Sequence, residues 1–272
     1  MFGFSEGKRY NSFVGYYRRR YGERLQKLVL DAGFSCPNRD GTVGRGGCTY
    51  CDNAAFHPGY STPGKPLLTQ IDEGIEFQKV RYPRARHYLA YFQAYSNTYG
   101  PLDRLKALYE EVLSHPEVVG IVIGTRPDCV DEKKLDYLAG LASGRVLSGW
   151  QRSLRRAPGP TVQAPVPDTL TAPIVVVEYG IESCHDSTLR HINRGHSFEC
   201  ARKAVEMTAE RGIDTGAHFI LGLPGETREM LLDQCGLISS LPLRSVKFHQ
   251  LQIVRGTVME KEYAADPSAF YR

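Results

Sequence analysis

The chain has 272 residues, of which 42% are hydrophobic and 24% are charged, and its net charge is +4 at neutral pH. This length suits one large α/β domain with a full hydrophobic core. The small positive charge permits a nucleic-acid partner without requiring one. The sequence contains no run of 18 apolar residues, so we expect no membrane-spanning helix.

The cysteines and the N-terminus indicate the compartment. Residues 1–9 lack the charged start and apolar core of a secretory signal. The seven cysteines are an odd number, and most of them lie outside any regular framework. Such thiols are typical of a reducing compartment, where cysteines act as ligands or stay free. We therefore expect a cytoplasmic protein.

Residues 1–27 are expected to form a basic N-terminal extension, because arginines and tyrosines are dense in residues 8–27. Cations interleaved with aromatic rings can bind phosphates and stack on bases. The other interpretation is an amphipathic helix that packs its rings onto the core. We favour the helix, because the stretch is short and the net charge is small.

Residues 28–272 are expected to form the core domain. A glycine-rich loop with three cysteines follows its first apolar run. Cys48 and Cys51 are separated by two residues, which lets two thiolates meet at one metal centre. Eleven residues separate Cys36 from Cys48, and four of these are glycines that let the loop fold back. The pattern predicts a three-thiolate site whose fourth position is open.

Three interpretations of this loop compete. A cubane iron–sulfur cluster takes thiolate ligands, and three of them leave one iron free for another ligand. A structural zinc site needs four ligands, and the nearest additional candidate is His57. The third interpretation is a set of buried thiols in a glycine-rich turn.

Apolar, β-branched runs alternate with helix-patterned segments along the chain. We expect strands at residues 28–34, 87–94, 118–125, 174–181, 214–221 and 246–254. We expect helices at residues 68–81, 102–113, 132–142, 198–211 and 227–241. The alternation predicts βαβ units and a parallel sheet, either a partial barrel or a doubly wound sheet. In both, chemistry gathers at the carboxyl ends of the strands, where the cysteine loop also lies.

Two segments depart from this alternation. Residues 143–173 are rich in proline, glycine and arginine and show no helix or strand period, which predicts a flexible insertion before the fourth strand. Residues 257–272 offer at most one or two helical turns, so we expect the C-terminal helix to be short or missing.

Polar or glycine-rich motifs follow the later strands. They are Tyr91-Phe-Gln-Ala-Tyr95, Thr125-Arg-Pro-Asp128, Ile192-Asn-Arg-Gly-His196 and Gly222-Leu-Pro-Gly-Glu-Thr227. Each alone is an ordinary turn or helix start. Together they place polar groups on the face that carries the cysteines.

These motifs, in this order and with the sequence around the three cysteines, resemble the radical S-adenosylmethionine (SAM) superfamily. The resemblance is to the branch of the Elongator catalytic subunit, which includes the bacterial YhcC-like proteins. It covers nearly the whole chain outside residues 143–172 and the last dozen residues. The gap between the first two cysteines is wider than the commonest spacing of the superfamily, as it is in this branch.

The resemblance implies an α/β fold, a partial (β/α)6 barrel of the TIM type, with a [4Fe–4S] cluster on Cys36, Cys48 and Cys51. The open iron would bind SAM, and an external one-electron donor of the flavodoxin or ferredoxin type would reduce the cluster. Cleavage of SAM would give a 5′-deoxyadenosyl radical that abstracts hydrogen from the substrate. The implied substrate is a wobble-uridine side chain on transfer RNA.

The resemblance also implies contacts with the cofactor. Tyr50 resembles the aromatic residue that packs on the adenine, and Arg194 resembles the arginine that pairs with the carboxylate. Gln93 occupies the place of a residue that contacts the amino group. Glu182 stands near the ribose hydroxyls, where relatives usually have glutamine.

The backbone of Gly222 and Leu223 would approach the adenine edge. Gly124 stands where the branch often has glutamate, so one polar contact with the cofactor is expected to be absent. Cys200 and Cys235 lie in helical patterns and are expected to be buried. We expect structural roles for four lone histidines, which are His191, His196, His218 and His249.

Two other functions remain open at this point. One is a catalytically silent RNA-binding or scaffold protein built on the same barrel. The other is a zinc site at the cysteine loop with His57 as the fourth ligand. The sequence does not define the product, the hydrogen-abstraction site or the oligomeric state.

Overall fold

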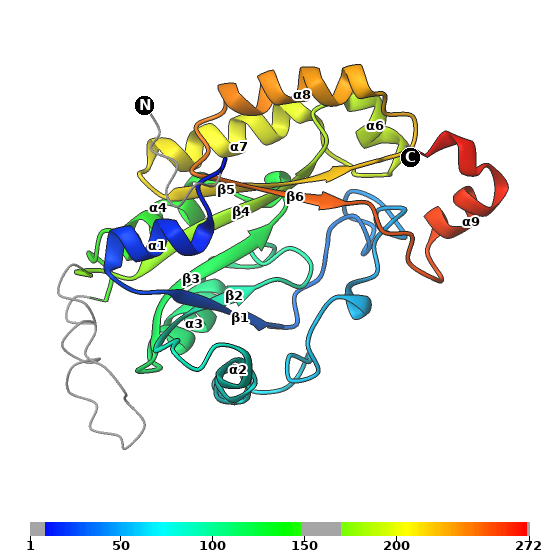
Figure 1. Cartoon of the computed structure of the whole chain (residues 1–272). Helices are drawn as coiled ribbons and strands as arrows, with labels where there is room; N and C mark the ends of the chain where they lie inside the picture. The colour runs from blue at the N-terminus through cyan, green and yellow to red at the C-terminus, as the bar shows by residue number, and fades with distance from the viewer. Residues whose placement is uncertain (1–8, 148–169, 271–272) are drawn as a thin grey trace.

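The computed structural model describes residues 9–147 and 170–270. Six parallel strands lie side by side in the order β1 to β6. The sheet curls into a half-barrel that carries helices on its outer side (Figure 1). The strand order follows the chain, which confirms the partial barrel and excludes a doubly wound sheet, whose strand order reverses at a switch point.

Most elements lie where the sequence pattern predicts them. The strands are β1 (Leu25–Leu30), β2 (His87–Phe92), β3 (Val118–Thr125), β4 (Ile174–Glu182), β5 (Asp214–Leu221) and β6 (Ser245–Gln250). The helices are α1 (Phe13–Tyr21), α2 (Leu67–Arg81), α3 (Leu102–Leu113), α4 (Glu132–Ala142), α6 (Asp186–His191), α7 (Phe198–Glu210), α8 (Arg228–Ser240) and α9 (Val258–Ala265). The five helices predicted from periodicity end within one residue of their predicted bounds.

The first strand begins earlier than predicted, at Leu25, and ends at Leu30. The backbone leaves the sheet at Asp31, whose carboxylate accepts a hydrogen bond from the Gly33 N–H at 2.9 Å. The buried Gln70 side chain holds this turn, because it bonds both the N–H and the carbonyl of Asp31 at 2.9 Å. The apolar residues of 31–34 therefore belong to the loop, and Lys27 lies inside the sheet.

The central strands are buried on both faces. Every residue of β2 is buried, and β3 and β4 are runs of valine and isoleucine with few exposed positions. This pattern is typical of parallel strands that helices cover on one side and a barrel interior covers on the other. A charged residue within such a strand needs a partner, and Glu178 of β4 is such a residue.

The basic N-terminal stretch forms helix α1, as favoured above. Ser12 caps the helix by accepting the Gly15 N–H, and Tyr17 is 3% exposed against the core. Arg20 forms an ion pair with Asp214 of β5 at 3.3 Å. The helix therefore lies across the gap between β1 and the last strands, near their amino ends (Figure 1).

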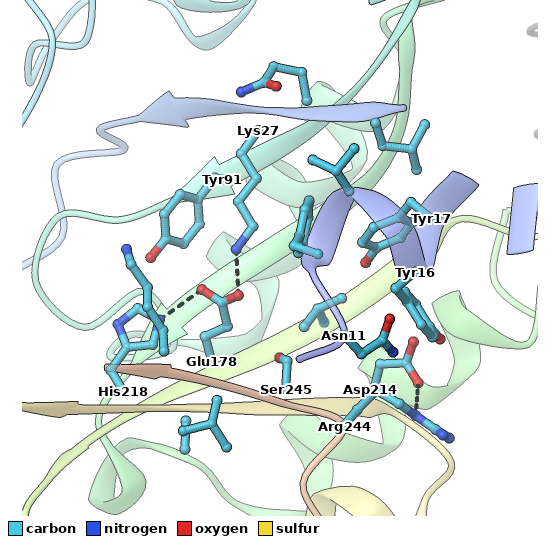
Figure 2. Close-up of a pocket in the computed structure, with 18 of the residues that line it drawn as sticks. Asn11, Tyr16, Tyr17, Lys27, Tyr91, Glu178, Asp214, His218, Arg244 and Ser245 are labelled. Atoms are coloured by element: carbon cyan, nitrogen blue, oxygen red, sulfur yellow. Dashed lines mark hydrogen bonds and ion pairs between the residues drawn. The ribbon is translucent and has the colours of Figure 1, made fainter. Parts of the chain in front are cut away.

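The barrel interior below α1 holds a cavity of about 500 Å³, which we call the barrel chamber. Its polar centre joins three strands, because Lys27 Nζ lies 2.5 Å from Glu178 Oε1 and His218 Nε2 lies 3.0 Å from Glu178 Oε2. Figure 2 shows these side chains converging, with Tyr91 beside them. Burial alone would raise the pKa of Glu178, but the His218 hydrogen bond and the Lys27 charge lower it to about 2.

This lowered pKa predicts a loss of stability in acid. Ionised Glu178 stabilises the fold above its ordinary pKa of 4.5, and the contribution falls as the pH drops towards 2. A shift of this size corresponds to about 3 kcal/mol in the free energy of unfolding. We expect Glu178→Gln to lose about this amount at pH 7 and less than about half of it at pH 3.

Urea unfolding at several pH values measures this difference. Glu111 is exposed, and its carboxylate contacts no charged group among residues 9–147 and 170–270, so Glu111→Gln is the matched control and should follow the parent protein. If the free energies of unfolding of Glu178→Gln and the parent differed by the same amount at pH 7 and at pH 3, the role of the ionised carboxylate would be contradicted.

Near the end of the chain lies helix α9, of eight residues, followed by a short 3-10 turn. The predicted insertion, 143–173, falls mostly on residues 148–169, which lie outside the described residues. Within the described ranges, no helix is both long enough and apolar enough to cross a membrane.

Candidate functional site

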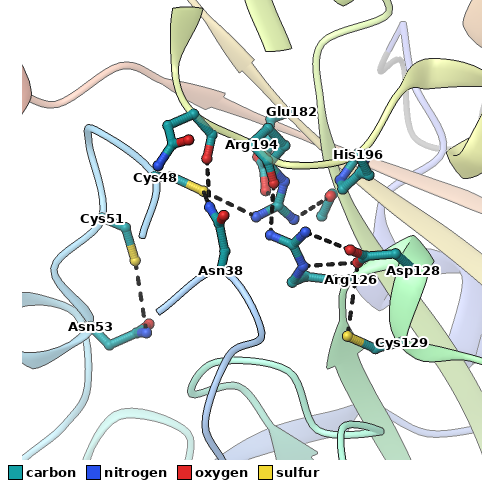
Figure 3. A network of polar contacts seen from close by, with 12 residues as sticks. Asn38, Cys48, Cys51, Asn53, Arg126, Asp128, Cys129, Glu182, Arg194 and His196 are labelled. Carbon is teal, nitrogen blue, oxygen red and sulfur yellow. Dashed lines mark hydrogen bonds and ion pairs between the residues drawn. The ribbon is translucent and has the colours of Figure 1, made fainter. Parts of the chain in front are cut away.

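A second cavity, of about 210 Å³, lies where the strands end, and all three cysteines of the loop line it. We call it the cysteine cavity. Cys36 and Cys48 are buried, Cys51 is half-buried, and all three are free thiols. Figure 3 shows Cys48 and Cys51 with the polar groups around them. Burial is the main reason that the pKa of the Cys51 thiol is raised.

The cysteine loop is folded by Asn38 rather than by regular structure. The Asn38 amide donates to the Asn193 carbonyl and points at Cys48 Sγ at 3.7 Å. The backbone carbonyl of Asn38 accepts the Gly47 N–H at 2.9 Å. Gly44 is required here, because a Cβ at this position would lie 2.2 Å from Asn38 Oδ1. The loop is thus held against the segment that follows α6.

Arg194 connects this segment to the cysteines. Its side chain is 8% exposed, and Nη1 donates to Cys48 Sγ at 3.4 Å. The same guanidinium lies 3.5 Å from Glu182 Oε1 and donates to the Gly180 carbonyl. Burial would lower the pKa of Arg194, but Tyr50, Cys48 and Glu182 raise it well above its ordinary value. Arg194 therefore stays charged beside the thiols.

Glu182 reaches the cavity because β4 ends irregularly. The pairing of β4 with β5 shifts register between Gly180 and Glu182, and Glu182 has a φ of +74°. A shift of this kind redirects a side chain that regular pleating would place elsewhere. Tyr50 also lines the cavity, and its pKa is raised mainly by burial.

Arg126 and Asp128, which the sequence presents as a turn within one of the family motifs, form an ion pair in which Arg126 is buried and Asp128 is half-buried. Arg126 is 2% exposed, and its guanidinium donates to the two Asp128 oxygens at 2.8 and 2.6 Å. Its third nitrogen donates to the Arg194 carbonyl at 2.7 Å. Arg126 thereby fixes the backbone from which Arg194 reaches Cys48 (Figure 3). A charged residue directly after a buried strand was the signal in the sequence.

Three free thiols that line one cavity fit the ligand set of a cubane cluster. Within residues 9–147 and 170–270, no group of three His, Cys, Asp or Glu side chains is compact enough to hold one metal ion. Zinc requires such a group, whereas each thiolate of a cubane binds a different iron. His57 is not part of the cavity lining, so the described geometry gives no support to the zinc interpretation. Arg194 Nε and Asn38 Oδ1 are buried without a partner in these ranges, as expected for groups that face a bound cofactor.

The remaining cofactor residues divide into two sets. Gln93 lines the cysteine cavity, and its amide lies 3.4 Å from the Phe56 carbonyl. Gly222 and Leu223 do not line the cavity. Leu223 is fully buried in a small apolar cluster that includes Ile192 and Met259. Their approach to an adenine edge stays a prediction.

The cysteines outside the loop differ in burial, and two of the four histidines lie at the cysteine cavity. Cys129 and Cys184 are buried, and burial raises the pKa of each thiol to about 12. Cys235 is exposed, so its predicted burial is wrong, because the outer face of α8 is open. His218 and His249 line the cysteine cavity.

Comparison with known proteins gives a consistent result. Residues 158–236 match the radical SAM superfamily. Protein YhcC of Escherichia coli is 36% identical over 255 residues, which are 94% of this chain and 72% of YhcC. Elongator complex protein 3 of Bos taurus is 25% identical over 77% of this chain and 40% of its own length. A tRNA uridine(34) acetyltransferase of Methanocaldococcus infernus is 26% identical over 41% of this chain and 15% of its own length.

Solved structures share the fold. The archaeal Elp3 of Methanocaldococcus infernus, solved with an N-terminal deletion, superposes with a TM-score of 0.56 at 16% identity. The match covers 91% of this chain and 50% of that structure, so the chain spans about half of its length. The curled six-stranded half-barrel is therefore common to both proteins.

Proposed function

This chain belongs to the radical SAM superfamily and is a YhcC-like member of it, and from that membership we propose that Cys36, Cys48 and Cys51 hold a [4Fe–4S] cluster that binds and cleaves SAM. The observation that carries the proposal is the common cavity that the three free thiols line at the ends of the strands. Buried, charged Arg194 faces the same space.

Each polar group in the cavity has a separate role in this proposal. Arg194 binds the carboxylate of SAM, and its contact with Cys48 offsets the negative charge of the thiolates. Glu182 accepts hydrogen bonds from the ribose hydroxyls, and Gln93 binds the amino group. Tyr50 packs on the adenine. Arg126 also lines the cavity, and it positions Arg194 through the hydrogen bond to the Arg194 carbonyl.

When bound, the reduced cluster supplies the electron that cleaves SAM to methionine and a 5′-deoxyadenosyl radical. The protein binds and orients the two reactants and excludes water from the cavity. We propose that the electron comes from an external donor of the flavodoxin or ferredoxin type and that the protein is cytoplasmic, where thiols stay reduced.

Anaerobic reconstitution with iron and sulfide, followed by dithionite and SAM, tests this proposal. We expect equal amounts of iron and sulfide on the protein and the formation of 5′-deoxyadenosine and methionine. One zinc per chain without iron or sulfide would support the zinc interpretation instead. A cluster at full occupancy that never cleaves SAM would favour a silent scaffold on the same barrel.

We propose transfer RNA as the substrate, with the wobble uridine as the modified nucleotide. The similarity to a tRNA uridine(34) acetyltransferase of Methanocaldococcus infernus motivates this choice. A basic surface that could bind RNA phosphates lies at the amino ends of β1 and β2. There, arginines surround an open hollow of about 500 Å³.

We call this surface the arginine hollow, and its five arginines are Arg18, Arg24, Arg81, Arg84 and Arg86. None of them forms an ion pair with another described residue. Arg24 lies 4.0 Å from the centre of the Tyr82 ring, a combination of cation and ring that binds phosphates and bases. The hollow and the cysteine cavity are separated by the length of a strand, about 20 Å, which one RNA stem can bridge.

We expect the combined change Arg24→Gln, Arg84→Gln and Arg86→Gln to weaken transfer RNA binding. Each lost phosphate contact lowers the slope of log K against log salt by about 0.7–0.9 in magnitude, so the slope should fall by about 2–3. Filter binding of transfer RNA between roughly 50 and 200 mM salt measures it.

Arg202→Gln, Lys203→Gln and Arg211→Gln, on or next to α7, form the control with the same change in net charge. An equal loss of binding in this control would show that only the net charge matters. Binding of the parent protein that ignores salt would contradict an RNA substrate.

A further inference from the structure

The barrel chamber and the cysteine cavity adjoin each other. Tyr91, Glu178, His218 and Lys247 line both of them. A molecule in the chamber therefore reaches the place where the proposed cofactor binds. With its volume of about 500 Å³, the chamber is the larger of the two spaces.

Most charged groups of the chamber already have partners. Lys27 and His218 are both bound to Glu178, and Asp214 lies 3.3 Å from Arg20 and 3.4 Å from Arg244. These contacts leave little free capacity to bind a further charge (Figure 2).

Lys247 of β6 is different. Its ammonium group has no hydrogen bond or ion pair with any residue of the described ranges, although it lines both cavities. Partial desolvation against the barrel wall lowers the pKa of Lys247, although the residue as a whole stays exposed to solvent. Within the described residues its ammonium group is a cation without a partner, and a bound anion can pair with it.

The wall of the chamber is aromatic and aliphatic. The Tyr91 and Phe13 rings line it, and their centres lie 4.6 and 5.0 Å from Lys27 Nζ. Val176 and Ala217 add aliphatic surface. A slender methylene stem fits such a wall, since burying it removes apolar surface from water.

We propose that the barrel chamber binds the end of a substrate that carries one anionic oxygen group, a carboxylate or a phosphate, on a short apolar stem, with Lys247 as the residue that binds the anion. The stem lies along Tyr91 and leads towards the cysteine cavity. The inference rests on the proposed function only where it calls the bound molecule a substrate, because the binding itself needs no radical chemistry.

Ligand-observed NMR with small probes tests the binding. The protein is reconstituted with its cluster and given SAM without reductant, and the same titration is repeated on the metal-free protein. The probes are valerate, butylphosphonate, and valeramide, which has the stem without the charge. We expect valerate or butylphosphonate to bind at least about tenfold more tightly than valeramide, and their relative affinities distinguish a carboxylate from a phosphate.

Variants of Lys247 locate the site. Lys247→Met should lose at least about tenfold in affinity for the anionic probes, Lys247→Arg should retain it, and Lys247→Glu should prefer pentylamine. Lys133→Met, on the exposed surface of α4, changes the net charge by the same amount and should bind like the parent.

Equal binding of valerate and valeramide would overturn the inference. So would unchanged binding of the anionic probes by Lys247→Met, or an equal loss in Lys133→Met. Failure of cluster assembly would count against the proposed function but not against the chamber, because the metal-free titration reports on the chamber alone.

Discussion

Replacing Cys48 by alanine is expected to abolish the formation of 5′-deoxyadenosine by the reconstituted protein. Cys48 is buried, receives a hydrogen bond from Arg194 and lies opposite Asn38, so its thiolate is at the centre of the proposed site. Two thiolates hold a cubane poorly. The rate of 5′-deoxyadenosine formation should therefore fall by at least about 1,000-fold, because the three ligands work only together. Product formation, iron content and sulfide content measure the effect together.

Cys129→Ala is the matched control for this experiment. Cys129 is also buried, and its Sγ lies 3.8 Å from Asp128, but it does not line the cysteine cavity. Burial raises the pKa of its thiol to about 12, and the thiol lies outside the cavity that Cys36, Cys48 and Cys51 share. Full iron content and activity in Cys48→Ala, or their loss in Cys129→Ala to the same extent, would contradict the assigned ligand set.

The parts of the fold that local periodicity determines were predictable from the sequence. Helices α3 and α4 have the predicted bounds, because their apolar positions repeat with the helical period and their ends are marked by proline or by an aspartate cap. Strand β3 also agrees, since it is a continuous buried run of β-branched residues. The close spacing of Cys48 and Cys51 is likewise local, and it drew attention to the correct loop.

The end of strand β1 was not predictable, because a residue distant in the sequence decides where the strand stops. Gln70 of α2 turns the backbone at Asp31 and so ends the strand. Ala32 and Phe34 extend the apolar run beyond Leu30, and the sequence gives no sign of the Gln70 contact. As a result, Lys27 was assigned to the N-terminal extension, although it pairs with Glu178 inside the barrel.

The support of the cysteine cavity also depends on contacts between distant parts of the chain. Arg126 bonds a carbonyl that lies 68 residues further on, and Asn38 bonds one that lies 155 residues further on. The turn after β3 was visible in the sequence, but its partners were not. The expected contacts of Gly222 and Leu223 depend on the bound cofactor and stay predictions.

Replacing Arg126 by methionine is expected to lower the free energy of unfolding by about 3–5 kcal/mol, the cost of breaking a buried ion pair. Methionine has a similar length but leaves the Asp128 carboxylate and the Arg194 carbonyl without their donors. Urea unfolding of the reduced, metal-free protein measures this loss. Because Arg194 loses its support, the Kd for SAM in the cluster-loaded variant should rise as well.

A second substitution separates the ion pair from simple packing. In the double variant with Arg126→Met and Asp128→Asn, the unpaired buried charge is removed, so this protein should be more stable than Arg126→Met alone. Arg202 of α7 is bound to Glu199 and Glu206 on the surface, and Arg202→Met should have little effect. If the double variant is instead as unstable as the two single changes added together, the charge pair is not what holds Arg194 in place, and the role of Arg126 is one of filling space.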